Sequence, residues 1–160
     1  MSRQLFIITS SVLILLLLST NVLSEEKAQL IKGPIIITSE MLTADNNAHT
    51  ALFERSVVAR TTDMTLYADK MLVYYDPDTG DISKIESAGN IKLIKKTRVT
   101  TSKEATYYAA EGDNPERVIF TGEPRTTDGD NVVTGTKITY FLDDDKYIVE
   151  ESKVFLKKRK

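Results

Sequence analysis

Few residues of this chain are of the types that catalyse reactions or bind metal ions, and those few lack suitable partners. The single histidine, His49, follows a turn-forming stretch, and the 160-residue chain contains no cysteine. A zinc site needs three or four ligands at workable spacing, and the sequence offers no such set. Acidic residues are plentiful but fall mostly in turn-like segments, without a paired general acid and base. The sequence therefore predicts a protein that is not an enzyme and that uses no metal and no cofactor.

The segment Asp76–Asp81, which reads Asp-Pro-Asp-Thr-Gly-Asp, weakly resembles an oxygen-rich calcium loop. Calcium loops of that kind end in a glutamate, and the corresponding position here is Ser87. We therefore expect a plain hairpin turn at Asp76–Asp81. Neither a glycine-rich phosphate loop nor a nucleophile elbow occurs in the sequence.

The tyrosines are better suited to contact an apolar ligand, because each combines a large ring with a polar tip. They lie in or beside segments that read as strands. Filling a β core with the hydroxyl at the wet rim is their ordinary role, and lining an open apolar groove is the alternative; the sequence leaves both open. The seven tyrosines are Tyr67, Tyr74, Tyr75, Tyr107, Tyr108, Tyr140 and Tyr147.

Charge argues against a nucleic-acid partner. The formal net charge is −2, and a nucleic-acid-binding domain is normally strongly basic. The basic tail Lys157–Lys160 is most simply solvated charge, although a basic cluster beside a groove could also meet lipid phosphates.

The elements that position these residues begin after residue 24. Arg3 precedes an almost entirely apolar stretch from Leu5 to Leu18, and small residues follow before Glu25. This is the layout of a cleaved signal peptide, and the stretch is shorter than the ~20 residues that span a bilayer. We expect residues 1–24 to be a signal peptide and residues 25–160 to form one domain, with an uncleaved anchor as the alternative.

From Pro34 onward the chain reads as strands separated by turns rich in Asp, Asn and Gly. Glycines inside strand patterns, at Gly89, Gly122 and Gly135, predict points where long ribbons bend and fold the sheet over on itself. The pattern predicts an all-β meander of antiparallel hairpins.

One two-part pattern recurs along this meander about every thirty residues. The leading halves are Thr38–Glu40, Ala68–Lys70, Thr101–Lys103 and Gly135–Lys137; the return halves are Phe53–Val57, Ser87–Ile91, Phe120–Pro124 and Glu150–Val154. Successive leading halves are 30, 33 and 34 residues apart. Such a period indicates about four stacked copies of one hairpin unit, and stacked β units form a continuous trough.

Alternation with period two gives each ribbon an inward and an outward face. After Leu66 and Ala68 the inward set continues either through Met71, Val73 and Tyr75 or through Leu72 and Tyr74, because a bulge near Asp69–Lys70 would shift the phase. The sequence alone does not decide between these two sets.

Four segments carry a resemblance to a known family. They are Leu66–Lys70, Ala88–Ile91, Phe120–Pro124 and Val132–Tyr140. With these segments in register behind a leader, the chain resembles the OstA-like family from about Pro34 to Leu156. The resemblance implies an open antiparallel β-jellyroll that stacks head to tail in the periplasm.

The same resemblance implies a lipopolysaccharide-binding protein that shields lipid A acyl chains in an apolar groove and bridges inner-membrane export machinery to an outer-membrane translocon. It implies LptC-like and LptD-like jellyroll partners and a head-to-tail homo-oligomer. Two alternatives remain: a membrane-anchored LptC-like component of that pathway, and a β-sheet adaptor with a dry core and no lipid ligand. The candidate groove-lining residues are Ile35, Ile37, Phe53, Val57, Leu66, Leu72, Tyr74, Ile91, Leu93, Tyr107, Phe120, Ile138 and Tyr140.

Overall fold

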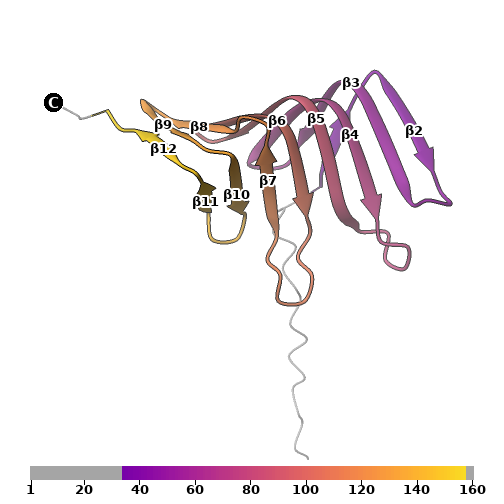
Figure 1. Cartoon of the computed structure of the whole chain (residues 1–160). Helices are drawn as coiled ribbons and strands as arrows, with labels where there is room; N and C mark the ends of the chain where they lie inside the picture. The colour runs from indigo at the N-terminus through magenta and orange to yellow at the C-terminus, as the bar shows by residue number, and fades with distance from the viewer. Residues whose placement is uncertain (1–33, 158–160) are drawn as a thin grey trace, which may run out of the picture.

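The computed structural model describes residues 34–157, and these form one antiparallel sheet of twelve strands without a helix (Figure 1). The strands are β1 (Ile36–Thr38), β2 (Met41–Asp45), β3 (Thr50–Arg60), β4 (Met64–Tyr75), β5 (Ile82–Lys95), β6 (Arg98–Tyr108), β7 (Arg117–Thr121), β8 (Arg125–Asp128), β9 (Asn131–Thr134), β10 (Lys137–Phe141), β11 (Lys146–Glu150) and β12 (Lys153–Phe155). The predicted all-β, antiparallel class is confirmed. The expected signal peptide, residues 1–24, lies outside the described residues, and within them no helix could cross a membrane.

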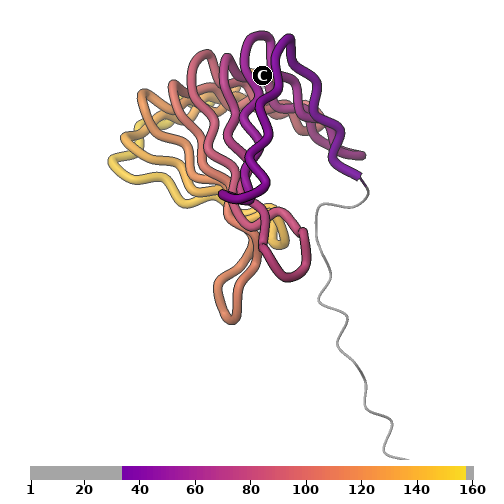
Figure 2. Tube along the Cα trace, turned by 90° about the vertical axis from the view of Figure 1, so that its right-hand side faces the viewer, coloured from indigo at the N-terminus to yellow at the C-terminus, as the bar shows by residue number. Residues whose placement is uncertain are grey.

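The sheet is folded lengthwise into two walls, which we call wall A and wall B. Wall A runs in the order β2, β3, β4, β5, β6, β7, β10, β11 and uses residues 50–54, 70–75, 82–88 and 104–108 of the four long strands. Wall B runs β1, β3, β4, β5, β6, β8, β9, β12 and uses residues 57–60, 64–68, 91–95 and 98–102. Figure 2 shows the successive strands stacked behind one another from indigo to yellow.

The crease between the walls is where the sequence repeat lies. In every return half at least one residue adopts a left-handed backbone: Arg55 and Ser56, Gly89 and Asn90, Gly122 and Glu123, and Glu151. Left-handed residues break the extended backbone, so each ribbon turns from one wall into the other at this point. The register shifts between Glu54 and Val57 and between Ala88 and Ile91 fall at the same places. The bends predicted at Gly89 and Gly122 are confirmed.

The leading and return halves of the repeat contact each other within the crease, on neighbouring strands. The Lys103 amide donates to the Gly122 carbonyl at 3.0 Å, and Asn90 Nδ2 donates to Asp69 Oδ2 at 2.8 Å. A Cβ at Gly122 would lie 2.6 Å from the Lys103 Cβ, and a Cβ at Gly89 would overlap the Asp69 carboxylate. In the second and third units, therefore, glycine in the return half makes room for the polar side chain of the leading half.

The core lies between the walls and draws on both. Met71, Val73 and Ile85 come from wall A, and Ile91 and Leu93 come from wall B; all five are buried in one cluster. Since these positions alternate with more exposed ones along each ribbon, the period-two pattern places the hydrophobic set inside.

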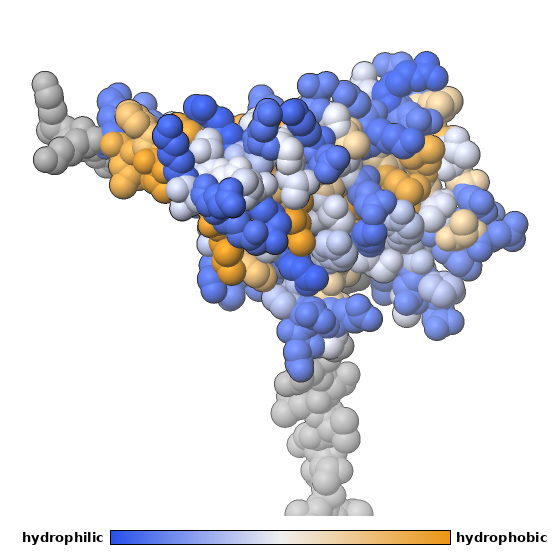
Figure 3. All heavy atoms as spheres, in the orientation of Figure 1, coloured by the Kyte–Doolittle hydropathy of each residue, from blue (hydrophilic) through white to orange (hydrophobic). Residues whose placement is uncertain are grey.

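Both ends of the stack are open sheet edges. Among the described strands β1 and β2 pair only with β3, β11 pairs only with β10, and β12 pairs only with β9. Large apolar side chains are exposed at each end, including Ile36 and Leu42 at the first and Val154, Phe155 and Leu156 at the last. In Figure 3 apolar residues gather at the β12 end of the molecule.

Candidate binding groove

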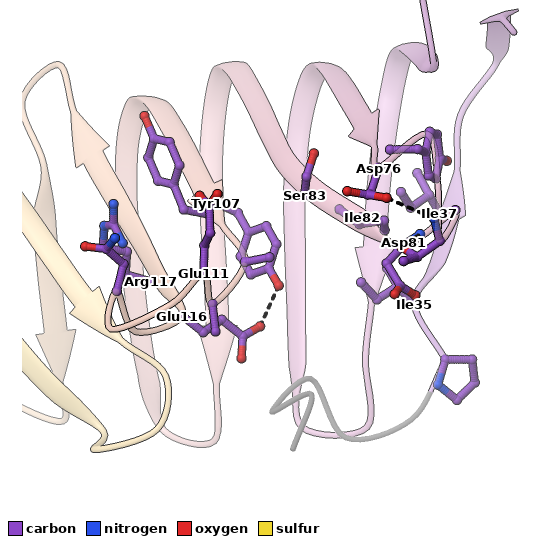
Figure 4. A pocket seen from close by; sticks show the side chains of 18 of the residues that line it. Ile35, Ile37, Asp76, Asp81, Ile82, Ser83, Tyr107, Glu111, Glu116 and Arg117 are labelled. Carbon is purple, nitrogen blue, oxygen red and sulfur yellow. Dashed lines mark hydrogen bonds between the residues drawn. The ribbon is translucent and has the colours of Figure 1, made fainter. Parts of the chain in front are cut away.

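A cavity of about 1150 Å³ opens between the walls in the first half of the stack (Figure 4). Ile35, just before β1, lines the cavity together with Ile37 of β1 and Phe53 of β3. Ile82 of β5 and Tyr107 of β6 line it from the strand ends of wall A that lie away from the crease. Its apolar side chains face a space open to solvent at the rim. An amphiphile could place its hydrocarbon part here and keep its polar part in water.

The rim of the cavity carries a buried polar pair. The Tyr107 hydroxyl donates a hydrogen bond to Glu116 Oε1 at 2.6 Å, drawn as a dashed line in Figure 4, and Glu116 is itself buried. Burial raises the pKa of Tyr107 well above its ordinary value, and the hydrogen bond to Glu116 raises it further. Tyr107 therefore stays neutral and fixes the 109–116 hairpin against wall A.

Beyond the cavity the walls are packed directly on each other. Phe120, Ile138 and Tyr140 of β7 and β10 are fully buried, and Thr100 of β6 and Thr126 of β8 are buried on wall B. A fully buried aromatic ring leaves no space for a ligand beside it, so the groove is open in the first half of the stack and filled in the second.

A polar network closes the filled half at the side away from the crease, where Lys95 and Arg98 of wall B meet Tyr140, Asp145 and Tyr147 of wall A and the β10–β11 turn. We call these five residues the cross-wall network. Lys95 donates to the Tyr140 hydroxyl, which donates to Asp145 Oδ1 at 2.8 Å. Arg98 donates to Asp145 at 2.9 Å and lies over the Tyr147 ring, which stacks on Tyr140. The network therefore joins the two walls directly.

Electrostatics within the network favour its charged state. The hydrogen bond from Tyr140, together with the Arg98 charge, lowers the pKa of Asp145. Burial alone would lower the pKa of Arg98, but the hydrogen bond to Tyr147 and the Asp145 charge outweigh burial and raise it. Burial and the bond to Asp145 raise the pKa of Tyr140. At neutral pH the network thus combines two cations, one carboxylate and two neutral phenols.

Eleven of the thirteen predicted lining residues point into the space between the walls. Six lie in the buried core: Val57, Ile91, Leu93, Phe120, Ile138 and Tyr140. Four pack against that core, namely Ile37, Phe53, Leu66 and Tyr107, and Ile35 lines the cavity. Only Ile35, Ile37, Phe53 and Tyr107 of the eleven reach the cavity itself.

Leu72 and Tyr74 were predicted to line the groove, but the structure places them on the outer face of wall A. The pairing of β4 with β5 shifts between Tyr67 and Lys70, so the inward set continues through Met71 and Val73. Leu72 and Tyr74 consequently face outward, where the Tyr74 hydroxyl donates to Glu86 Oε2 at 2.8 Å. The bulge near Asp69–Lys70 decides the phase that the sequence left open.

The cross-wall network was missed in the sequence, although one signal for it was present. Lys95 has the same parity as Ile91 and Leu93, so alternation alone would place it inside. Its partners Tyr140 and Asp145 lie 45 or more residues away, and only the stacking of the walls brings them together.

The segments weighed as possible metal sites are turns. Asp76 Oδ1 accepts hydrogen bonds from the amides of Asp78 and Thr79, both at 2.9 Å, which confirms the expected hairpin turn. His49 has a left-handed backbone in the β2–β3 turn. Residues 34–157 contain no group of three or more His, Asp or Glu side chains placed to hold a metal ion.

Comparison with known proteins gives one family and one fold. Residues 36–146 match the family described as "LptA/(LptD N-terminal domain) LPS transport protein". Among solved structures the fold is similar to that of LptH from Pseudomonas aeruginosa, described as the LptA homologous periplasmic component of the conserved lipopolysaccharide transport device. That match has a TM-score of 0.68 and 15% identity, and it covers 81% of this chain and 99% of LptH. No curated protein matches the sequence.

Proposed function

The chain belongs to the family of LptA and the LptD N-terminal domain, a family of lipopolysaccharide transport proteins, and from this we propose that it binds lipopolysaccharide in the periplasm and holds the lipid A acyl chains between its two walls. The family is one of transport proteins, in agreement with the expectation that the chain is not an enzyme. The observation that carries the proposal is the cavity between the walls, where the apolar side chains of Ile35, Ile37, Phe53 and Tyr107 lie beside a rim of polar and acidic residues.

The physical need for such a groove is large. Each methylene group exposed to water costs about 0.8 kcal/mol, so an acyl chain of about a dozen methylenes costs roughly 10 kcal/mol. A lipid with several chains cannot cross an aqueous compartment unless its hydrocarbon is covered. A trough open at the rim covers the chains and leaves the sugars in water.

We further propose that the protein bridges neighbouring jellyrolls through its open edges, with LptC-like and LptD-like domains and other copies of itself as partners. The exposed apolar side chains of β1, β2 and β12 support this, because unpaired strands with apolar surface favour pairing with another strand. Sedimentation of the mature protein over a wide concentration range should show association. Deletion of residues 153–160 should abolish the association while the remaining strands keep their fold; a strictly monomeric profile that also lacks binding to jellyroll partners would refute the bridge.

Photocrosslinking tests the lipid site directly. Photoreactive residues at Phe53 and Tyr107, inside the groove, should crosslink to lipopolysaccharide, whereas one at Leu72, on the outer face of wall A, should not. Equal labelling at all three positions, or labelling only at Leu72, would place the lipid elsewhere.

The packed second half of the stack favours one alternative. If no lipid enters the cavity in the first half, the protein is an adaptor without a lipid ligand, and neither Phe53 nor Tyr107 will label. The LptC-like alternative is tested separately by intact mass. A mature chain that starts near Glu25 supports a released periplasmic protein, and a retained leader with membrane fractionation supports the anchored form.

A further inference from the structure

One row of side chains on the outer face of wall A alternates aromatic rings with cations. The six residues are direct cross-strand partners on β4, β5, β6, β7, β10 and β11, in the order Tyr74, Lys84, Tyr108, Arg117, Phe141 and Lys146. They face outward because their neighbours in sequence, such as Tyr107, Val118 and Tyr140, pack inward. We call these six residues the outer row.

Four of the five neighbouring pairs in the outer row are in contact, each a cation beside an aromatic ring. Lys84 Nζ lies 5.1 Å from the ring centre of Tyr74 and 6.0 Å from that of Tyr108, and the Arg117 guanidinium lies 4.8 Å from Tyr108. Lys146 Nζ lies 5.9 Å from Phe141. A cation held over an aromatic ring loses less freedom when it binds an anion, since its position is already restricted.

The outer row also lies next to the groove. Its members stand at the ends of the wall A strands that lie away from the crease, and both Tyr108 and Arg117 belong to the lining of the cavity as well. The row and the cavity therefore share one rim at Tyr108 and Arg117, and Phe141 and Lys146 continue the row beside the filled half of the stack. A ligand whose hydrocarbon occupies the cavity would bring its headgroup to this rim.

Two of the three cations have no carboxylate partner within the described part of the chain. Lys84 is paired with Glu86, and this pairing raises the pKa of Lys84 and lowers that of Glu86. Among residues 34–157 Arg117 donates only to the Pro115 carbonyl, at 3.1 Å, and neither Arg117 nor Lys146 forms an ion pair there. These two cations are available to an external anion.

We infer that the outer row binds the phosphate groups of the lipid headgroup while the acyl chains occupy the groove. This inference rests on the proposed function. Neighbouring strands are about 4.8 Å apart, so cations on every second strand recur at about 10 Å and the row extends over about 24 Å along the stack. Arginine and lysine are the usual partners of phosphate. Their repetition along the stack gives a headgroup successive similar contacts in the direction in which the jellyrolls would join.

The test compares two lipids and three double variants of the mature protein. In Arg117→Gln/Lys146→Gln, affinity for bisphosphorylated lipid A should fall about tenfold, while affinity for lipid A stripped of its phosphates should not change. The control Lys92→Gln/Lys103→Gln removes the same charge outside the row and should bind both lipids like the wild type. The swap Arg117→Lys/Lys146→Arg keeps both charges and should retain most of the affinity.

The results separate this inference from the proposed function. Equal losses for both lipids, or an equal loss in the control, would overturn the outer row as a phosphate site. A double variant that binds bisphosphorylated lipid A as tightly as the wild type would overturn it as well. If the wild type binds neither lipid, the proposed function fails. Urea midpoints for each variant establish that a loss of binding is not a loss of folding.

Discussion

Replacing Tyr140 with phenylalanine removes the hydroxyl at the centre of the cross-wall network and should destabilise the protein by about 2 kcal/mol. The hydroxyl accepts from Lys95 and donates to Asp145. Hydrogen bonds to charged groups contribute about 1.5–3 kcal/mol each when they are shielded from water. The Asp145 side chain is 55% exposed, so water replaces most of that bond, whereas Lys95 is only 15% exposed and loses its nearest acceptor. Lys95 keeps Asp63 at 3.7 Å, which prevents a larger penalty.

Urea unfolding at neutral pH measures this effect. With a slope of about 1.5 kcal/mol per molar urea, a loss of about 2 kcal/mol moves the midpoint down by roughly 1 M. The matched control is Tyr67→Phe, because the exposed Tyr67 hydroxyl makes no hydrogen bond with residues 34–157, and it should change stability by less than about 0.5 kcal/mol. A loss in Tyr140→Phe no larger than in the control would show that the network does not hold the walls together.

The same variant has an expected pH dependence. The pKa of Asp145 is lowered in the folded protein. Its contribution to the free energy of unfolding is therefore present above the unfolded pKa of about 3.9 and is lost as the pH falls through the lower folded value. The difference in stability between wild type and Tyr140→Phe should therefore shrink in strong acid. A difference that stays constant down to that range would assign the effect to packing alone.

Three further predictions follow from other parts of the molecule. Gly122→Ala should destabilise the fold by about 2 kcal/mol, because Gly122 has a φ of 72° and a new Cβ would meet Lys103; urea unfolding measures this, and a neutral effect would mean that the crease relaxes. Since the pKa of Tyr107 is raised in the folded protein, its contribution to the free energy of unfolding is full below the unfolded pKa of about 10 and declines as the pH rises beyond it. Tyr107→Phe should therefore reduce the loss of unfolding free energy at alkaline pH. An unchanged dependence of the unfolding free energy on alkaline pH would contradict this. Phe53→Asp should place a charge in the cavity and reduce lipopolysaccharide binding at least tenfold, whereas Leu72→Asp, on the outer face, should bind normally; the reverse order in a binding titration would invert the assignment of the two faces.

The crease and the stacking were predictable because they depend on local chemistry. The crease needs a left-handed position that favours glycine or asparagine, and a polar residue on the next strand that fits against it. These two requirements produce a short sequence motif that recurs at a regular period. Gly89 with Asp69 and Gly122 with Lys103 are such pairs. The fold class therefore followed from the sequence without any knowledge of distant contacts.

The face of Leu72 and Tyr74 was not predictable in the same way. A bulge shifts the inward-facing set by one residue. The pair Met71 and Val73 and the pair Leu72 and Tyr74 are both apolar or aromatic, so hydrophobicity does not show which pair faces inward. Tertiary packing decides, because Met71 and Val73 complete a core whose other members are far away in sequence. The closure of the groove beyond Phe120 depends on contacts of the same long range.

The two ends of the stack are different surfaces, since β1 and β2 form one and β11 and β12 form the other. Any association of one end with the other is heterologous, and each added copy presents the same free end as the copy before it. Such a chain has a direction and does not terminate by itself. Its length would be limited by partners that offer only one matching end and by the supply of free protein, so a cap at either side would set both the orientation and the number of copies.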